Sequence, residues 1–246
     1  MIKTGLVSIT FRPLSAEEII SLVSQARLDG IEWGGDVHVP HGDIAVAERV
    51  RNITENAGLA VAAYGSYYRI GDNASPKFEN VLVSAVALGT SKIRVWAGTG
   101  SDVTSLEDRR RTIDDAKRIA DLAGEKGITI VTEWHGDTLT DTLESAKSFL
   151  DDVGRDNFKT YWQPLAKRPV DACLTEINEI LPYLAGMHVF AWEETQRLPL
   201  VHHLSRWEKY FAHTTQAGDF YALLEFVEND SPQAFLRDAA VLKEIS

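Results

Sequence analysis

Short apolar runs alternate with amphipathic segments along the whole chain. Eight of these runs have the length and composition of buried strands, and the segments after them carry apolar residues at helical spacing. Repeated strand–helix pairs predict a parallel sheet covered by helices. The expected strands are Thr4–Thr10, Gly30–Trp33, Ala60–Gly65, Lys92–Trp96, Ile128–His135, Phe158–Trp162, Gly186–Ala191 and Tyr221–Val227. Eight pairs within 246 residues predict one α/β domain over residues 1–246, a single (β/α)₈ TIM barrel.

Local signals at the helix ends agree with this pattern. Ser15 and Asp43 stand where helices are expected to begin, and their side chains can cap the first turn. An open, doubly wound sheet is the structural alternative. It normally carries a glycine-rich phosphate loop after the first strand, whereas this chain has Thr10–Pro13 (TFRP) at that place. The closed barrel is therefore the favoured fold.

Composition restricts the range of partners and compartments. The formal net charge is −11 and the isoelectric point is about 5.1, which disfavours general binding to nucleic acid or to anionic membrane surfaces. No apolar stretch approaches the roughly 20 residues of a membrane-spanning helix. The single cysteine, Cys173, cannot form an internal disulfide, and the first residues lack the apolar core of a secretory signal. We expect a cytoplasmic protein that binds a small molecule, without nucleic-acid or membrane partners.

Polar side chains interrupt four apolar runs where the strands are expected to end. In chain order they are Glu133, Gln163, His188 and Glu225. The carboxyl ends of parallel barrel strands share one rim, so these side chains should converge there. Inward carboxylates are costly unless a positive partner compensates them, and a divalent cation can serve both. Oxygen and nitrogen donors without thiolate suit Mn²⁺, Mg²⁺, Co²⁺ or Zn²⁺.

The same residues carry a resemblance to a known family. Gly30–Gly35 (GIEWGG), Ala57–Leu59 (AGL), Glu133, His188 and Glu225 resemble the xylose isomerase-like TIM barrels, and within them the sugar phosphate isomerase/epimerase group. The resemblance covers essentially the whole chain. It implies a divalent metal held by Glu133, His188, Glu225 and a ligand from the sixth strand. It also implies that the chain could pair as a homodimer.

The sixth strand departs from the family pattern. Family members commonly have Asp at this position, followed three residues later by His, whereas this chain has Gln163 and Ala166. The neutral amide of Gln163 can offer a carbonyl oxygen, but it removes one negative charge from the ligand set. We therefore expect weaker metal binding than in a site with four charged or imidazole ligands.

The resemblance also implies a reaction. Glu133 and Glu225 would act as catalytic carboxylates that move a proton through an enediolate, so that a small, unphosphorylated sugar or polyol is epimerised or isomerised. A dehydratase of an inosose-like or keto-acid substrate is the first alternative, because the same groups could expel water after proton abstraction. A carbohydrate-binding barrel that has lost its metal is the second. An abasic-site endonuclease is disfavoured, because this acidic chain lacks a basic face for DNA.

Further residues near the expected rim are candidates for substrate binding. Hydroxyl, imidazole and guanidinium groups can bind sugar oxygens, and aromatic rings can pack on sugar C–H faces. Glu32 could either orient the substrate or hold an arginine of the site. The long connection from Trp192 to His203 is expected to serve as a lid or a substrate wall. The candidates are Glu32, His38, Tyr64, Tyr67, Arg69, Trp96, His135 and Arg197.

Overall fold

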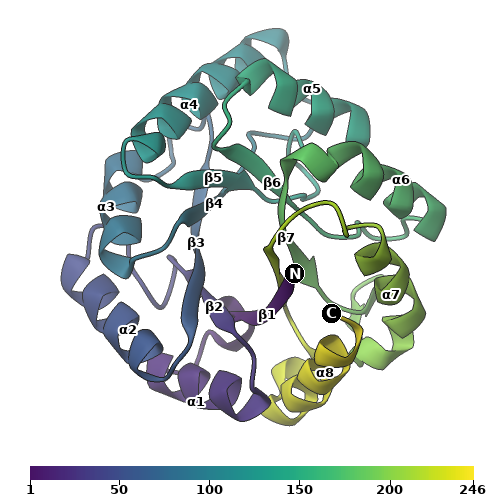
Figure 1. Ribbon diagram of the computed structural model, residues 1–246. Helices are drawn as coiled ribbons and strands as arrows, with labels where there is room; N and C mark the ends of the chain where they lie inside the picture. The colour runs from purple at the N-terminus through teal and green to yellow at the C-terminus, as the bar shows by residue number, and fades with distance from the viewer.

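A closed barrel of eight parallel strands forms the centre of the molecule. The computed structural model describes residues 1–246, and Figure 1 looks along the barrel, with the helices arranged around the strands. The strands are β1 (Ile2–Val7), β2 (Gly30–Gly34), β3 (Ala60–Arg69), β4 (Lys92–Trp96), β5 (Thr129–Thr132), β6 (Phe158–Trp162), β7 (Leu184–Val189) and β10 (Phe220–Leu224). Each strand pairs with its neighbour in this order, and β10 pairs with β1 to close the barrel. The predicted (β/α)₈ barrel is confirmed.

Eight α-helices pack around the barrel. They are α1 (Ala16–Ala26), α2 (Ile44–Asn56), α3 (Phe78–Leu88), α4 (Leu106–Gly124), α5 (Leu143–Val153), α6 (Val170–Ile180), α7 (Leu204–Ala212) and α8 (Pro232–Ile245). Ser15 and Glu18 form a reciprocal capping box at the start of α1, and the Asp43 side chain accepts a hydrogen bond from the backbone N–H of Val46 at the start of α2. Both predicted helix starts are therefore confirmed.

The apolar core has two parts, one outside and one inside the barrel. A cluster of 58 buried residues fills the space between strands and helices. A second cluster of nine buried residues comes from the inward faces of the strands and includes Val7, Val131, Tyr161 and Leu223. Its side chains fill the barrel as a solid core, so the only room for chemistry is at an end of the barrel.

Several strands differ from their predicted bounds in ways that affect the site. The fifth strand ends at Thr132, so Glu133 and His135 follow the strand and are not part of it. The first strand ends at Val7, and residues Ser8–Phe11 form the short 3₁₀ helix η1. The connection after β7 contains the antiparallel hairpin of β8 (Trp192–Glu193) and β9 (Gln196–Arg197) and the 3₁₀ helix η3 (Leu200–His203). The sequence analysis expected a long loop here that serves as a lid or a substrate wall, and Trp192 lines the cavity.

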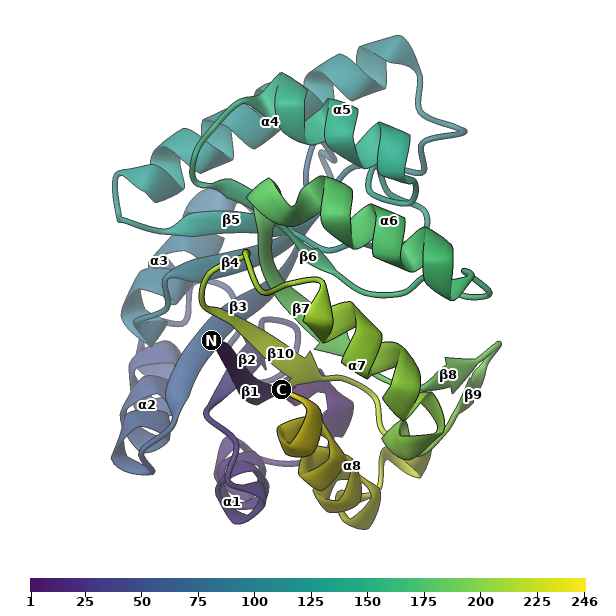
Figure 2. The same ribbon diagram turned by 45° about the vertical axis from the view of Figure 1, so that its right-hand side comes forward.

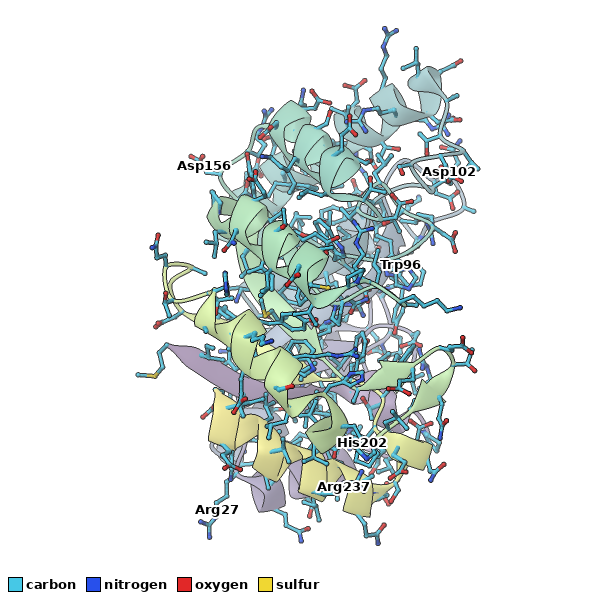
Figure 3. All side chains as sticks on the ribbon, turned by 90° about the vertical axis from the view of Figure 1, so that its right-hand side faces the viewer. Arg27, Trp96, Asp102, Asp156, His202 and Arg237 are labelled. Atoms are coloured by element: carbon cyan, nitrogen blue, oxygen red, sulfur yellow. The ribbon has the colours of Figure 1, made fainter.

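The loops that follow the strands gather on one side of the molecule. In Figure 3, Trp96, Asp102 and His202 lie on this side, whereas Asp156, in the loop before β6, lies on the opposite side. The β8–β9 hairpin projects from the same rim beside α7 (Figure 2). None of the helices is both long enough and apolar enough to cross a membrane.

Candidate active site

A cavity of about 220 Å³ opens at the carboxyl ends of the barrel strands. Its walls combine charged and polar groups with five aromatic rings, and they come from most of the strands and loops around the rim. The lining residues are Ile9, Arg12, Tyr67, Arg94, Trp96, Glu133, His135, Gln163, Phe190, Trp192, Glu225 and Phe226. A cavity of this size suits a small substrate, because pockets for drug-sized ligands start at about 300 Å³.

The four expected metal ligands lie together, and three of them, Glu133, Gln163 and Glu225, line this cavity. Single donor atoms of Glu133, His188 and Glu225 all lie within 4.8 Å of one another. His188 Nδ1 is 3.5 Å from Glu133 Oε1, 3.5 Å from Glu225 Oε2 and 3.0 Å from Gln163 Oε1. All four side chains are buried. The convergence expected from the strand ends is therefore present in the structure.

Arg94, in β4, is the central charged residue that the sequence analysis did not select. Its guanidinium is 1% exposed and pairs with two carboxylates: Nε lies 2.6 Å from Glu32 Oε1, and Nη1 contacts Glu133 Oε2. The guanidinium also lies over the ring of Tyr67, 5.0 Å from its centre. Arg94 therefore supplies part of the positive charge that the inward carboxylates require. The sequence analysis expected that Glu32 could hold an arginine of the site, but it did not say which one.

A glycine in the neighbouring strand makes room for Arg94. A Cβ atom at Gly65 would lie 2.7 Å from Arg94 Nη2 and 2.8 Å from Glu32 Oε1, closer than side chains tolerate. Gly65 and Arg94 are paired in register between β3 and β4. The sequence did contain a signal for Arg94: it is an arginine inside an expected strand, and a glycine of the neighbouring strand lies opposite it.

Glu133 is held as a fixed carboxylate. Its Oε2 accepts hydrogen bonds from Arg94 and from Trp96 Nε1, the latter at 2.6 Å. Burial alone would raise its pKa, but the charge of Arg94 and the hydrogen bond to His188 outweigh burial and keep the pKa of Glu133 below its usual range. A carboxylate of this kind is a good anionic ligand but a weak proton acceptor.

The pKa values of His188 and Glu225 are both raised, but for different reasons. Burial opposes the charged form of His188, but Glu225, Glu133 and Glu32 around it raise the pKa of the imidazole to about 10. Burial raises the pKa of Glu225, and the repulsion from Glu133 adds to this effect. The second ring nitrogen, His188 Nε2, lies 3.5 Å from Glu32 Oε2. Glu32 thus faces both Arg94 and His188.

The donor set fits a divalent metal ion. His188 directs Nδ1 at the two glutamates and Gln163, and its Nε2 faces the carboxylate of Glu32, which is the usual arrangement behind a metal-bound imidazole. With His188 neutral, the charges of a divalent ion and Arg94 together balance the three carboxylates of Glu32, Glu133 and Glu225. Binding requires His188 to lose its Nδ1 proton.

His135 lines the cavity, and its Nδ1 is already hydrogen-bonded. Its Nδ1 lies 2.5 Å from the carbonyl oxygen of Gly136, and its ring stacks at a tilt against Trp96, with centres 5.4 Å apart. A carbonyl can only accept a hydrogen bond, so Nδ1 carries the proton and, in the neutral ring, Nε2 carries a lone pair. The arrangement therefore presents a base at the cavity.

Tyr67 reaches the cavity through an irregularity in β3. The pairing of β3 with β4 shifts register between Gly65 and Tyr68, and Tyr67 adopts a positive φ of 55°. Such bulges occur next to active sites, where they redirect a side chain. The Tyr67 hydroxyl accepts a hydrogen bond from Arg12 at 3.1 Å, and its ring meets Trp96 edge to face. Of the three predicted aromatic residues Tyr64, Tyr67 and Trp96, the last two thus line the cavity.

The other expected substrate-binding residues lie outside this cavity. The Tyr64 hydroxyl is buried and donates to the carbonyl of Val39. His38 is buried and bonds to Ser8 Oγ and to the carbonyl of Leu14. Tyr64 lies within β3 and His38 follows β2, and both side chains are used in packing contacts away from the cavity.

The two expected arginines also have structural partners. Arg69 contacts the carbonyl of Gly98 and lies over the ring of Trp96, 4.9 Å from its centre. Arg197, on β9, contacts Asp230 and packs over Phe226, 4.6 Å from the ring centre. It lines a neighbouring surface hollow and not the cavity at the strand ends. Because both are loop or strand-end residues, the sequence did not determine the direction of their long side chains.

Comparison with known proteins settles the family. The family model described as xylose isomerase-like TIM barrel matches residues 20–244. The chain belongs to this family. It is 28% identical over 202 residues to a 3-dehydroshikimate dehydratase from Bacillus anthracis, an alignment that covers 76% of this chain and 70% of the relative.

Solved structures with the same fold include proteins with different activities. A probable 3-DHS dehydratase, AsbF, from Bacillus anthracis superposes with a TM-score of 0.80 at 20% identity and covers 99% of both chains. A 3-keto-D-glucoside 4-epimerase from E. coli gives 0.73 at 16% identity, with 100% of both chains covered. A D-psicose 3-epimerase from Clostridium cellulolyticum gives 0.72 at 14% identity, with 99% and 98% covered. At these identities the structural likeness establishes the fold alone.

Proposed function

We propose that the chain is a divalent-metal-dependent dehydratase of a small hydroxylated keto acid. The observation that carries the proposal is the placement of His135, a base with a free lone pair, beside the donor cluster of Glu133, His188 and Glu225. The sequence relationship supports it, because the curated relative at 28% identity is named a dehydratase, whereas the epimerases resemble the chain in fold. The dehydratase, which the sequence analysis gave as the first alternative to an epimerase or isomerase, thereby becomes the leading hypothesis.

Glu133, His188, Glu225 and Gln163 would hold the metal. When bound there, a divalent ion polarises a carbonyl oxygen and makes the neighbouring C–H bond more acidic. Glu133 stays anionic because Arg94 and Trp96 both donate to its Oε2. Glu32 orients His188 through its contact with Nε2. Each residue therefore has a defined role in keeping the donor set in place.

The residues of the cavity can carry out a balanced elimination of water. His135 Nε2 accepts the proton from the carbon next to the carbonyl, the electrons of that C–H bond form a C=C bond, and the β-hydroxyl leaves. The protonated imidazole then returns its proton to the leaving oxygen, and the products are one alkene and one water. Glu133 suits this proton transfer less well, because its pKa is lowered.

Other lining groups are suited to orient the substrate. Arg94 Nη2 is buried without a hydrogen-bond partner, and the guanidinium lines the cavity, so that a substrate oxygen can accept from it. Tyr67 and Trp96 provide aromatic walls that meet at 90°. A six-membered ring can pack on these faces while its oxygens reach the polar base.

A product assay tests the proposal directly. The purified protein is incubated with 3-dehydroshikimate, with Mn²⁺ or after treatment with a chelator, and the aromatic dihydroxybenzoate that forms by loss of water is followed by its near-ultraviolet absorption. We expect formation that depends on the metal. A panel of ketoses and inosose-type polyols in D₂O runs in parallel.

Two results would overturn the dehydratase. Deuterium incorporation into a ketose, without a dehydrated product, would establish the epimerase or isomerase expected from the family resemblance. Retained sugar binding with no metal taken up at saturating Mn²⁺ would establish a carbohydrate-binding barrel.

A further inference from the structure

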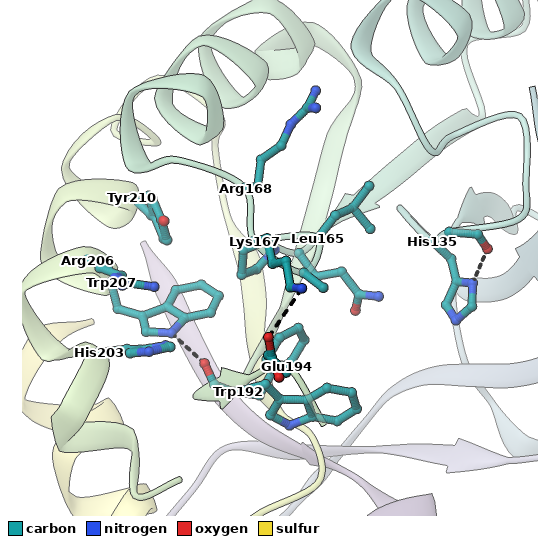
Figure 4. A pocket seen from close by; sticks show the side chains of 15 residues that line it. His135, Leu165, Lys167, Arg168, Trp192, Glu194, His203, Arg206, Trp207 and Tyr210 are labelled. Carbon is teal, nitrogen blue, oxygen red and sulfur yellow. Dashed lines mark hydrogen bonds and ion pairs between the residues drawn. The ribbon is translucent and has the colours of Figure 1, made fainter. Parts of the chain in front are cut away.

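A second hollow, drawn in Figure 4, has part of its wall in common with the cavity at the strand ends. Its volume is about 220 Å³, and it is bounded by the loop after β6, the β8–β9 hairpin and α7. We call it the side pocket. It shares His135, Gln163, Phe190 and Trp192 with the cavity at the strand ends, so the two spaces adjoin at these side chains. A molecule whose reacting carbon lies near His135 can therefore extend into the side pocket.

His203 gives the side pocket an unused polar group. Its side chain is 8% exposed, and Nε2 is buried without a hydrogen-bond partner. Buried polar atoms are nearly always paired, so an orphan that lines a pocket points to a missing ligand. The nearest acidic atom is Glu193 Oε1, at 3.8 Å, which is beyond hydrogen-bonding distance. The Glu193 side chain is 65% exposed and can turn into solvent.

Arg206 supplies an unpaired positive charge next to His203. It lies one turn of α7 from His203, lines the same pocket and contributes to the low pKa of that imidazole, after burial as the larger cause. Unlike Arg168, which pairs with Glu176, and Lys167, which pairs with Glu194 at 3.2 Å, Arg206 has no acidic partner. A free guanidinium beside a buried imidazole in a chain of net charge −11 is a selective place for an anion.

We propose that the side pocket is a carboxylate-binding subsite, in which Arg206 and His203 Nε2 hold the carboxylate of a cyclic substrate whose ring reaches the donor cluster. The aromatic walls formed by Trp192 and Trp207 suit the ring of such a molecule. This inference deepens the proposed dehydratase function and rests on it for the identity of the substrate. The binding of the anion itself does not depend on catalysis.

Binding of a simple aromatic carboxylate tests the subsite without turnover. The full chain, labelled with ¹⁵N at histidine, is titrated with benzoate, with its neutral analogue benzamide and with inorganic phosphate, and the His203 imidazole signal is assigned by its loss in His203→Gln. We expect saturable binding of benzoate that shifts this signal and binding of benzamide that is at least about tenfold weaker, since a guanidinium–carboxylate pair is charge-assisted.

Surface variants separate the subsite from general charge effects. Arg206→Gln should weaken benzoate binding by about tenfold or more, because it removes the charge that faces the anion. Arg110→Gln is the matched control, since Arg110 is exposed on α4, lines neither cavity and makes no ion pair. Glu193→Gln should leave binding unchanged or tighten it. All three substitutions are at exposed positions, so the fold is expected to persist.

Each outcome bears on the proposal. Benzoate that fails to bind, that leaves the His203 signal unmoved or that binds Arg206→Gln and Arg110→Gln equally well overturns the subsite, and so does binding of phosphate in place of benzoate. If benzoate binds as expected but 3-dehydroshikimate is not dehydrated, the proposed function fails while the subsite stands. If dehydration occurs, Arg206→Gln should raise KM and leave kcat nearly unchanged; an unchanged KM would overturn the subsite alone.

Discussion

The inside of the barrel contains two layers that obey different rules. The lower layer, with Val131, Tyr161 and Leu223, is apolar and packed. The upper layer at the strand ends contains Arg94 and four acidic or imidazole side chains, all buried. Packing stabilises the lower layer in proportion to the area removed from water, whereas the upper layer is stable only if every charge meets an opposite charge. The comparison teaches that the same strands can support both layers because, in the charged layer, Arg94 and His188 face the buried carboxylates.

Removal of Arg94 should break the upper layer most severely. Arg94→Met leaves Glu32 and Glu133 buried without their cation, and the expected loss is about 3–5 kcal/mol in the free energy of unfolding. Urea unfolding followed by circular dichroism measures it. Arg110→Met, an exposed change of the same kind, should cost no more than about 0.5 kcal/mol. Equal effects in the two variants would mean that the carboxylates do not depend on Arg94.

Loss of His135 should abolish chemistry while it leaves both layers intact. His135→Gln removes the proposed base, and we expect a fall in kcat of about 10²–10⁴-fold with unchanged Mn²⁺ content. His135 lies after β5 and is not a member of the donor cluster, so thermal unfolding should be little altered. His202→Gln, on the rim surface, is the matched control. Full activity in His135→Gln would assign the base to another group, such as Glu225.

Adding one methyl group at Gly65 tests whether Arg94 needs the space that this glycine leaves. Gly65→Ala places a Cβ against Arg94 Nη2 and Glu32 Oε1, and the ion pair must shift to admit it. The expected cost is about 1–3 kcal/mol, the usual range for overpacking. Gly136→Ala is a suitable control, because a Cβ there meets nothing within 4 Å. A neutral effect of Gly65→Ala would show that the upper layer is looser than the lower one.

The smallest expected change adds a charge to the donor cluster. Gln163→Asp restores the carboxylate that family members commonly carry, and we expect Mn²⁺ to bind about tenfold more tightly, measured by calorimetry. The variant should be less stable than the parent without metal, because a fourth carboxylate joins the buried set. Gln163→Asn separates side-chain length from charge. Unchanged affinity in Gln163→Asp would place Gln163 outside the ligand set.

The sequence by itself determined the fold and the place of the site. Eight apolar runs separated by helical segments, without a glycine-rich phosphate loop after the first strand, favour a closed parallel barrel over an open sheet. The carboxyl ends of parallel strands share one rim, so Glu133, Gln163, His188 and Glu225 were expected to approach one another, as they do. This part was predictable because it depends on repeating backbone geometry and not on individual side-chain directions. The metal and the reaction remain proposals.

The tertiary structure decided which other groups reach the cavity. Side chains alternate between the two faces of a strand only while the strand stays regular, and β3 bulges at Tyr67. Sequence position therefore could not show that Tyr67 lines the cavity whereas Tyr64 is bonded to the carbonyl of Val39. Arg94 was missed for a related reason. A buried arginine is stable only when its partners surround it, and Glu32, Glu133 and Gly65 come from three other parts of the chain. Their distances from Arg94 exist only after the barrel has closed.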